Sequence, residues 1–364
     1  MAIAYANGKV FTGERTVTDK AVLVDDKIIT GIVDAAAIPS HYKKEDLNGN
    51  TIAPAFIDMQ IYGGNGKMFS HELSVESLQA THEYCLAGGC AHFMITMATN
   101  TIEKFLKSFD VIRAYWSAGG NGLLGLHLEG PYLNMAKRGA HLPDCIKKPT
   151  VEEVKMLLQK GEGVFKMITI APEQCSDEVI ELLLKHNIIV SAGHTNATYK
   201  QAQQGFAKGI PAATHLFNAM SALQHREPGM VGAIFNHPTV FSSLVCDGIH
   251  VDFEAIKIAK RQMQQRLFFI TDAVAETTSG EYQHLFKGDH YALPDGTLSG
   301  SALTMMQCVK NGIQKVGIEL EEALRMASTY PAQLLTDHKL GKIEKGYGAS
   351  FVVFDGALTV QGVY

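Results

Sequence analysis

Four polar residues come directly after apolar runs of the sequence, and their types suit metal-dependent hydrolysis. Glu129, His194 and Asp272 each end such a run, and His215 lies in the run 212–217, directly after Thr214. One carboxylate and two imidazoles form a mixed oxygen and nitrogen set that suits a divalent cation such as Zn²⁺ and leaves positions open for water and substrate. Asp272 then stands where a general base belongs. The sequence therefore predicts a metal-dependent hydrolytic centre.

Each of these residues also has a structural interpretation. A single histidine at a strand end is more often hydrogen-bonded than metal-bound, and a single aspartate after a strand is usually a helix N-cap. Four such residues at four strand ends are harder to explain in this way. Buried carboxylates and imidazoles are costly unless a metal or partner groups compensate them. We therefore favour the metal interpretation.

Eight short apolar runs alternate with segments of helical period, which is typical of a (β/α)₈ TIM barrel. Several runs are apolar at both parities, as expected of parallel strands covered on both faces. The carboxyl ends of all barrel strands open on one mouth, so the four polar residues should converge there. A doubly wound open sheet is the alternative. The runs span residues 51–60, 90–96, 123–129, 165–171, 188–194, 212–217, 242–247 and 267–272, and the helical segments 75–86, 102–116, 151–159, 177–186, 199–208, 252–265, 303–316 and 321–329.

The two ends of the chain have a β-rich character that differs from the middle. Residues 21–24 and 28–33 predict two strands around a tight turn, and residues 341–343 and 349–354 predict further short strands. Chain termini often lie close together in space. We therefore expect one small β-sandwich-like domain from residues 1–50 plus 337–364, and a catalytic barrel from residues 51–336.

Composition excludes several classes of protein. Of the 364 residues, 46% are hydrophobic and 19% are charged, which is typical of a globular chain. The net charge of −5 and the lack of a Lys/Arg cluster argue against a nucleic-acid partner. Six cysteines without a Cys-x-x-Cys pair predict reduced thiols. With no signal peptide and no apolar run of ~20 residues, we expect a cytoplasmic protein that does not bind membranes.

Six motifs that occur in order along the chain resemble the N-acetylglucosamine-6-phosphate deacetylase family of the amidohydrolase superfamily. The similarity extends from about residue 48 to residue 353. Each motif alone would be a weak signal, but the six together are specific. They are residues 126–131 (LHLEGP), 192–198 (AGHTNAT), 214–220 (THLFNAM), 226–229 (REPG), 247–251 (DGIHV) and 296–301 (GTLSGS).

The resemblance implies a role for each residue of the predicted centre. Glu129, His194 and His215 match the ligands of one divalent cation per subunit, with Zn²⁺ as the first candidate and Fe²⁺, Co²⁺ and Mn²⁺ as alternatives. Asp272 matches the family's general base and acid. His250 matches a substrate-binding residue that polarises the acetyl carbonyl and stabilises its oxyanion.

Further residues match positions that bind the sugar and its phosphate. His141 matches a sugar-contacting histidine, and Asn218 and Ala219 match positions near the phosphate. His225 and Arg226 match a phosphate clamp, and a guanidinium group binds phosphate bidentately. In this family the clamp can come across a dimer interface. The resemblance therefore implies a homodimer that acts on a small amino-sugar phosphate.

The sequence departs from many relatives of the superfamily at the first barrel strand. Where those relatives carry a His-x-His pair, this chain has Gln60 and Tyr62, which we interpret as vestigial positions of a second metal. Lys166 lies near the start of the fourth strand, not at its end, so a carbamylated bridging lysine is not expected. Both features predict one metal ion instead of two.

The resulting hypothesis is a hydrolase that converts N-acetylglucosamine 6-phosphate to glucosamine 6-phosphate and acetate in amino-sugar catabolism. The nearest alternatives are deacetylation of N-acetylgalactosamine 6-phosphate or of an N-acyl amino acid. A cyclic amidohydrolase or deaminase on the same barrel is a second class, and a non-catalytic barrel protein is a third. His225 and Arg226 favour a phosphorylated substrate among these.

Overall fold

The computed structural model describes residues 1–335 and 339–364, and these form two compact units. One unit contains the segments Met59–Tyr84 and Phe93–Leu303. The other contains Met1–Asp58, Cys85–His92 and Thr304–Tyr364. The predicted domain boundary between residues 336 and 337 lies outside the described residues, and the predicted division at residues 50 and 337 stays a prediction.

Eight strands form one sheet in the order β17-β16-β15-β14-β13-β12-β11-β8. Neighbouring strands from β11 to β17 pair in parallel. A parallel bridge between Ile61 and Ala273 joins the first strand to the chain after the last one, as in a closing barrel. The predicted (β/α)₈ fold is confirmed. The strands are β8 (Phe56–Ile61), β11 (Cys90–Ala98), β12 (Leu123–Glu129), β13 (Phe165–Ile170), β14 (Ile189–Ala192), β15 (Ala212–Ala213), β16 (Phe241–Val245) and β17 (Leu267–Ile270).

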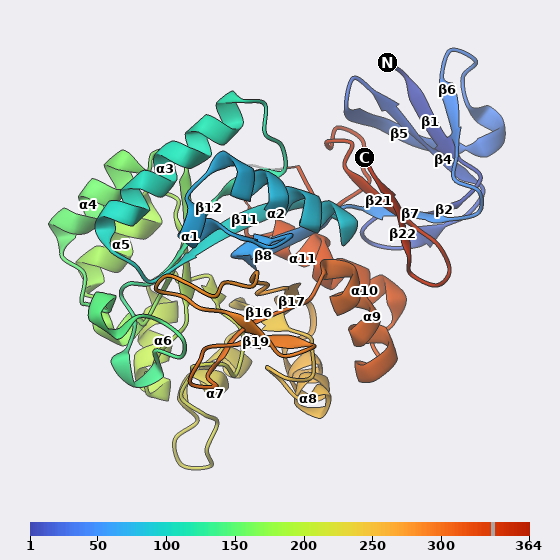
Figure 1. Ribbon diagram of the computed structural model, residues 1–364. Helices are drawn as coiled ribbons and strands as arrows, with labels where there is room; N and C mark the ends of the chain where they lie inside the picture. Colours follow the sequence, from blue (N-terminus) through green and yellow to red (C-terminus); the bar gives the residue numbers. More distant parts are fainter. Residues whose placement is uncertain (336–338) are drawn as a thin grey trace. The chain divides into compact units, whose positions relative to one another are not determined.

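Helices follow the strands, and α3 to α8 lie around the outside of this sheet (Figure 1). Most begin at a Ser, Thr or Asp side chain that accepts a hydrogen bond from a backbone N–H of the first turn, which satisfies an otherwise unpaired donor. The predicted helical segments are found with end points shifted by a few residues. The helices are α1 (Phe69–Glu72), α2 (Val75–Ala87), α3 (Ile102–Ser117), α4 (Val151–Lys160), α5 (Asp177–Lys185), α6 (Tyr199–Ala207), α7 (Gly229–Asn236), α8 (Phe253–Met263), α9 (Met305–Asn311), α10 (Leu320–Ala327) and α11 (Thr329–Ala332).

The first predicted run, residues 51–60, is two strands instead of one. Its first part is β7 (Thr51–Pro54), which pairs with β2 and β21, and its second part is β8 of the barrel sheet. The chain changes sheets at Pro54 and Ala55. Pro54 has no backbone N–H, so it suits the end of a strand. An apolar run alone cannot reveal this change of partners.

The terminal segments form two further sheets, with strand orders β5-β4-β1-β6 and β22-β21-β7-β2-β3. Their buried side chains, among them Val22, Ile52 and Phe351, form one hydrophobic cluster. Both ends of the chain contribute, so the predicted small terminal β domain is confirmed as part of the fold. The strands are β1 (Ile3–Ala6), β2 (Lys9–Phe11), β3 (Thr16–Val17), β4 (Lys20–Asp25), β5 (Ile28–Asp34), β6 (Lys43–Asp46), β21 (Phe351–Phe354) and β22 (Val360–Val363).

Short hairpins extend the barrel unit beyond its main sheet. The strands β9 (Gly63–Gly64) and β10 (Lys67–Met68) pair antiparallel. The strands β18 (Leu285–Phe286), β19 (His290–Ala292) and β20 (Leu298–Ser301) form a three-stranded antiparallel sheet. The sequence analysis assigned no structure to these segments, although both contribute residues to the pocket described below.

Two expectations from composition can be compared with the structure. All six cysteines are free, as predicted. Across residues 1–335 and 339–364, no helix is long and apolar enough to cross a membrane.

Candidate active site

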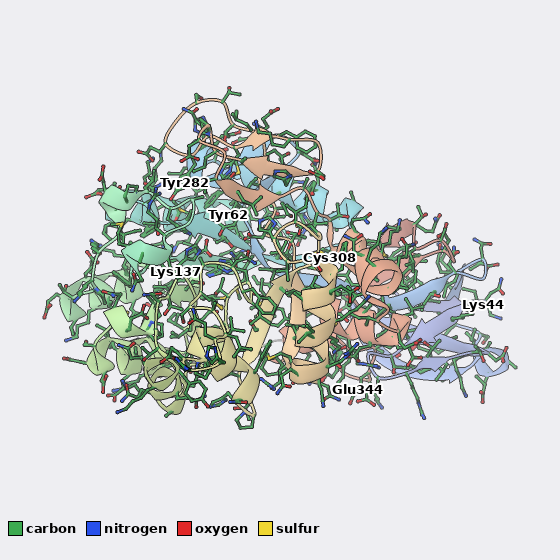
Figure 2. All side chains as sticks on the ribbon, turned by 90° about the horizontal axis from the view of Figure 1, so that it is seen from below. Lys44, Tyr62, Lys137, Tyr282, Cys308 and Glu344 are labelled. Atoms are coloured by element: carbon green, nitrogen blue, oxygen red, sulfur yellow. The ribbon has the colours of Figure 1, made fainter. Side chains whose placement is uncertain are left out.

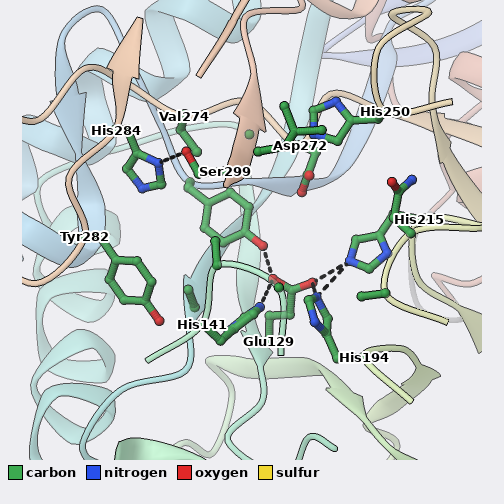
Figure 3. A pocket seen from close by; sticks show the side chains of 18 of the residues that line it. Glu129, His141, His194, His215, His250, Asp272, Val274, Tyr282, His284 and Ser299 are labelled. Atoms are coloured by element: carbon green, nitrogen blue, oxygen red, sulfur yellow. Dashed lines mark hydrogen bonds and ion pairs between the residues drawn. The ribbon is translucent and has the colours of Figure 1, made fainter. Parts of the chain in front are cut away.

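A pocket of about 170 Å³ in the barrel unit collects most of the predicted site residues (Figure 3). Its lining includes the four residues from the strand ends, together with His141, Asn218, Ala219 and His250. Tyr62 and Tyr282, labelled among all side chains in Figure 2, also line this pocket. The convergence expected from a parallel barrel is therefore present in the structure.

Three atoms meet at the centre of the predicted metal site. Nε2 of His215 lies 3.0 Å from Oε1 of Glu129, and Nε2 of His194 lies 3.3 Å from the same oxygen. The two Nε2 atoms are 3.1 Å apart. Ligands held about 2.0–2.1 Å from one Zn²⁺ ion are themselves about 2.8–3.4 Å apart in octahedral or tetrahedral geometry. The triangle therefore has the size that a single divalent cation requires.

The protonation of His194 supports the same conclusion. Its Nδ1 lies 2.8 Å from the carbonyl oxygen of Lys137, so Nδ1 carries the proton and donates it there. Nε2 then presents a lone pair to the carboxylate of Glu129, and two lone pairs facing each other call for a cation between them. Burial and the neighbouring His141 lower the pKa of His194 to about 4, which keeps the ring neutral. The side chains present fit a divalent cation.

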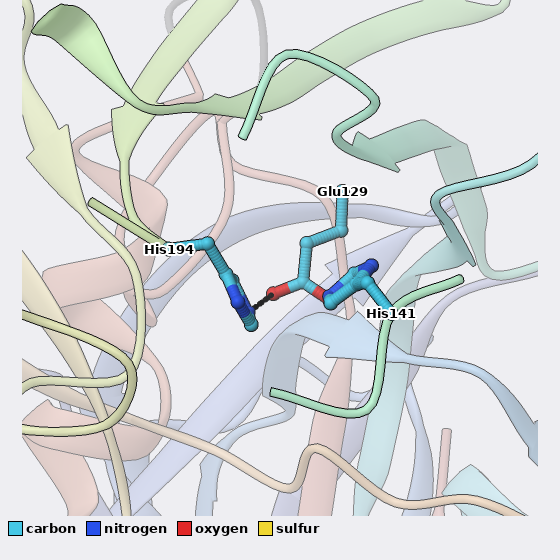
Figure 4. Close-up of side chains that lie close together, drawn as sticks. All are labelled: Glu129, His141 and His194. Atoms are coloured by element: carbon cyan, nitrogen blue, oxygen red, sulfur yellow. Dashed lines mark ion pairs between the residues drawn. The ribbon is translucent and has the colours of Figure 1, made fainter. Parts of the chain in front are cut away.

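His141 also touches Glu129, but with the opposite tautomer. The backbone N–H of Thr99 donates to Nδ1 of His141 at 3.2 Å, so the ring proton lies on Nε2. Nε2 is 3.2 Å from Oε2 of Glu129 and donates to it. Glu129, His141 and His194 form a compact group of ligand-type side chains (Figure 4), yet the tautomer makes His141 a hydrogen-bond donor to the carboxylate and not a metal ligand.

Glu129 is held so that one of its oxygens, Oε1, faces the two imidazoles of the predicted cation site. Oε2 accepts hydrogen bonds from the phenol of Tyr62 and from His141, whereas Oε1 faces His194 and His215. The residue is 2% exposed. Burial alone would raise the pKa of Glu129, but His141 and His194 outweigh burial and hold the pKa well below its usual range. The carboxylate is therefore ionised.

Gln60 joins Glu129 to the predicted general base. Its Nε2 lies 2.8 Å from Oδ1 of Asp272, 3.1 Å from Oε1 of Glu129 and 3.0 Å from the phenol oxygen of Tyr62, so its two N–H groups are shared among three acceptors. Burial raises the pKa of Asp272 from its usual value, with His215 opposing and Glu129 adding to the rise. Two carboxylates are thus oriented by one neutral amide.

The backbone is strained where these side chains leave it. His194, His215 and Asp272 have φ angles of 46°, 37° and 55°, in the left-handed region that such residues rarely adopt. Gly130, directly after Glu129, has φ of 89°, and a Cβ there would lie 2.1 Å from Oγ1 of Thr99. Unfavourable backbone conformations of this kind cluster at functional sites, where the surrounding fold holds them.

His250 is paired with Asp247, which lies three residues before it and two residues after the end of β16. Nδ1 of His250 donates to Oδ2 of Asp247 at 2.6 Å, and backbone N–H groups of Ile249 and His250 bind the other carboxylate oxygen. Burial alone would raise the pKa of Asp247, but its bonds with His250 lower the pKa below the usual value. The carboxylate fixes the ring orientation and directs Nε2 away from itself.

The predicted phosphate residues are split between two places. Asn218 and Ala219 line the pocket, whereas His225 and Arg226 are exposed and are not part of its lining. Among the described residues, Arg226 forms no ion pair. A clamp built by His225 and Arg226 is therefore not assembled within a single chain.

Several residues in and around the pocket had no predicted role. Asp247 could have been found from its spacing in the run 247–251, because an aspartate three residues before a histidine can orient it. Tyr282 and His284 lie beside the small sheet β18-β19-β20, outside every motif recognised in the sequence, whereas Ser299 lies in the motif 296–301 but was given no role. Their position next to the metal site depends on the tertiary fold.

The family assignment comes from comparison with known proteins. Residues 51–363 match the Amidohydrolase family, and residues 3–52 match the NagA composite domain. The chain belongs to the amidohydrolase family. Membership implies a divalent metal ion, and Glu129 and His194 belong to a group of side chains in this amidohydrolase that could hold it.

Relatives of this amidohydrolase include sugar-phosphate deacetylases. It is 36% identical to the N-acetylglucosamine-6-phosphate deacetylase of Haemophilus influenzae, over all of this chain and 97% of the relative. It is 31% identical to the N-acetylgalactosamine-6-phosphate deacetylase of Shewanella sp., over 98% and 93% of the two chains. The structure of the N-acetylglucosamine-6-phosphate deacetylase of Pasteurella multocida superposes with a TM-score of 0.95, at 35% identity, over all of this chain and 98% of that one.

Proposed function

We propose that this amidohydrolase removes the acetyl group from N-acetylglucosamine 6-phosphate and releases glucosamine 6-phosphate and acetate. The triangle of Glu129, His194 and His215 beside Asp272 is the observation that carries the proposal. Full-length similarity to deacetylases of this substrate supports it. The predicted place in amino-sugar catabolism follows from the same reaction.

Glu129, His194 and His215 would hold one divalent cation per chain, and Zn²⁺ is our first candidate because it suits two imidazoles and one carboxylate. Fe²⁺, Co²⁺ and Mn²⁺ are the alternatives. A cation there supplies a Lewis acid for the amide carbonyl and lowers the pKa of water. The Gln60 amide, bonded to both carboxylates, supports a count of one, because it takes the place of a side chain that could bind a second cation.

Two further residues move or hold protons during hydrolysis. Asp272 accepts a proton from the attacking water and later delivers it to the sugar nitrogen as the C–N bond breaks, so that acetate and the amine leave. Nε2 of His250 donates to the oxygen that becomes negative when water adds to the carbonyl, with Asp247 holding the ring. The water contributes one hydroxyl to acetate and one hydrogen to the amine.

The phosphate clamp supports a homodimer. His225 and Arg226 are exposed on their own chain and free of ion pairs in its described parts, which suits residues that reach a partner's pocket. Asn218 and Ala219 would bind the phosphate from within, and the ring of His141, whose two nitrogens are paired with Thr99 and Glu129, would lie against the sugar. Replacing Arg226 by alanine should raise KM for phosphorylated substrate and leave activity on an unphosphorylated analogue unchanged. The cytoplasmic location stays a prediction from the sequence.

Acetate release tests the proposed function. The metal-loaded enzyme should release acetate from N-acetylglucosamine 6-phosphate, and a chelator-treated sample should not. N-acetylgalactosamine 6-phosphate and unphosphorylated N-acetylglucosamine serve as the comparison substrates, since the relative from Shewanella sp. acts, by its name, on the galacto epimer. Faster turnover of the galacto epimer would favour that second function, and no turnover of either would contradict the deacetylase proposal.

A further inference from the structure

His284 is a buried histidine of the pocket that the proposed reaction does not use. Its residue is 4% exposed, and it lines the same pocket as Glu129 and Asp272. Nδ1 is paired with the hydroxyl of Ser299 at 2.9 Å. Within residues 1–335 and 339–364, Nε2 has no hydrogen-bond partner. Figure 3 shows the His284 ring with one nitrogen on Ser299 and the other turned away from it, into the pocket.

The surroundings of His284 are rigid and largely apolar. The ring stacks on Tyr282, with ring centroids 6.1 Å apart and planes within 4°. Tyr282 is itself fixed, because its hydroxyl donates to the carbonyl of Thr99 at 2.6 Å and accepts from the N–H of Leu142 at 3.3 Å. Val274 lines the pocket beside them and is 6% exposed. Nε2 has no partner in the described part of the chain and opens on the pocket, so it is available to pair with a ligand there.

The chemistry of that ligand group can be inferred by elimination. Burial lowers the pKa of His284 to about 4, so the ring is neutral and does not attract a phosphate dianion. The acetamide belongs at the Glu129 triangle, where the metal ligands and Asp272 lie. The remaining polar groups of an amino-sugar phosphate are its ring hydroxyls. A neutral imidazole nitrogen can donate to, or accept from, such a hydroxyl.

We propose that Nε2 of His284 binds one non-reacting hydroxyl of the sugar ring and thereby selects the substrate, with Tyr282 supporting the imidazole. This inference rests on the proposed function for the identity of the sugar. Ser299 orients the ring through Nδ1 so that Nε2 faces the ligand. His284 is a substrate-binding residue in this proposal and takes no part in proton transfer.

Two matched substitutions of His284 distinguish the contribution of Nε2 to substrate binding from that of Nδ1. The amide of His284→Gln can place a polar atom where Nε2 lies, whereas the shorter amide of His284→Asn reaches only the position of Nδ1 and its bond to Ser299. We expect His284→Asn to lower kcat/KM about tenfold, mostly through KM, since one hydrogen bond to the substrate is lost. His284→Gln should keep most of the wild-type value. Equal losses in both variants would overturn the proposal.

Substrate analogues that lack a single ring hydroxyl identify the partner. N-acetylglucosamine 6-phosphate without the hydroxyl at C1, C3 or C4 is assayed with the wild type and with His284→Asn. One analogue should lose about tenfold in kcat/KM with the wild type and lose nothing more with His284→Asn. Losses that simply add in every analogue would contradict a direct contact. An unchanged kcat/KM of the wild type with all three analogues would also contradict it, and this measurement does not depend on the folding of a variant.

Binding measurements keep this inference separable from the proposed function. Calorimetry with glucosamine 6-phosphate and its deoxy forms reports the His284 contact without any turnover. If acetate release fails while the hydroxyl dependence of binding persists, the proposed reaction is wrong and the His284 contact stands. If acetate release succeeds and no hydroxyl couples to His284, the contact is wrong and the reaction stands.

Discussion

Two parts of the pocket differ in how their polar atoms are paired. We call them the metal corner (Gln60, Tyr62, Glu129, His194, His215 and Asp272) and the hairpin wall (Tyr282, His284 and Ser299). At the metal corner, the Glu129 oxygens and the Gln60 amide meet five neighbouring side chains, and Nδ1 of His215 is the buried atom there without a partner in the described chain. In the hairpin wall around β18, β19 and β20, His284 presents a ring nitrogen with no partner in the described chain. Paired charges hold the side chains in a fixed geometry, whereas a nitrogen without a protein partner is available for a hydrogen bond with a ligand.

This difference separates chemistry from selection. A cation and a proton carrier need positions fixed to within a fraction of an ångström, and dense hydrogen bonding with strained backbone at His194, His215 and Asp272 provides them. Selection among similar sugars needs one polar contact in surroundings that give no alternative partner. Substitutions at the metal corner should therefore change kcat or metal binding, and substitutions in the hairpin wall should change KM and substrate preference.

The largest effect is expected at the general base of the metal corner. Asp272→Asn removes the proton acceptor and keeps the size of the side chain, so kcat should fall by about 10²- to 10⁴-fold. The metal content per chain should stay at the wild-type level, because Asp272 is not among the three proposed ligands. Steady-state kinetics with elemental analysis of the same samples checks both points. A near-normal kcat would show that another group is the general base.

Acidification should weaken the hairpin wall through His284. The pKa of His284 is about 4 in the folded chain, against an ordinary value of 6.5. Between these two values the imidazole binds a proton more readily in the unfolded chain than in the folded chain. The contribution of His284 to the free energy of unfolding is therefore complete above pH 6.5 and is lost as the pH falls towards 4. The loss from this residue should reach roughly 3 kcal/mol.

The matched control for this pH dependence is His284→Phe, which keeps an aromatic ring and has no titrating group. Urea unfolding at pH 7 and pH 4.5 measures both proteins. The wild type should lose about 2–3 kcal/mol more than the variant between these two pH values. Parallel losses would show that His284 is not held neutral by burial.

Metal affinity should depend on the phenol that holds the far oxygen of Glu129. Tyr62→Phe removes the donor to Oε2 and keeps the ring in its cluster with Met68 and Val274. Groups that orient a metal ligand typically contribute 10- to 100-fold to affinity, and we expect a loss in that range. Competition with a chromophoric chelator measures the dissociation constant. An unchanged constant would mean that His141 alone orients the carboxylate.

A smaller effect is expected where the Gln60 amide joins the two carboxylates. Gln60→Met keeps the length of the side chain and removes the donors to Asp272 and Glu129, so kcat should fall about tenfold as Asp272 loses its orientation. Gln60→Glu is the contrasting variant, since it places a third carboxylate between the two and should be worse than methionine near pH 7. Equal activity of both variants and the wild type would leave Gln60 without a role.

The barrel and the metal corner were predictable from sequence because both follow from local patterns. Glu129, His194 and Asp272 each end an apolar run, and parallel strands bring such ends together whatever lies between them. The break of residues 51–60 into β7 and β8 was not predictable in this way. It depends on which sheet each half pairs with, and pairing partners lie far away in sequence.

The hairpin wall and the tautomer of His141 needed the tertiary structure. His284 follows no apolar run, and only the fold carries it to the same pocket as Glu129. The role of His141 is decided by a backbone N–H of Thr99, forty-two positions away, which no side-chain motif encodes. Side chains that lie at the end of a barrel strand could be found from the sequence. Side chains whose role depends on a distant backbone atom could not.

The metal content of two histidine variants tests the central claim most directly. After reconstitution with Zn²⁺ and removal of excess metal, the wild type should retain about one ion per chain. His215→Ala should lose most of this metal, because it removes a proposed ligand. His141→Ala should retain the metal, since its Nε2 carries a proton in the geometry described. Metal kept by His215→Ala and lost by His141→Ala would contradict the account.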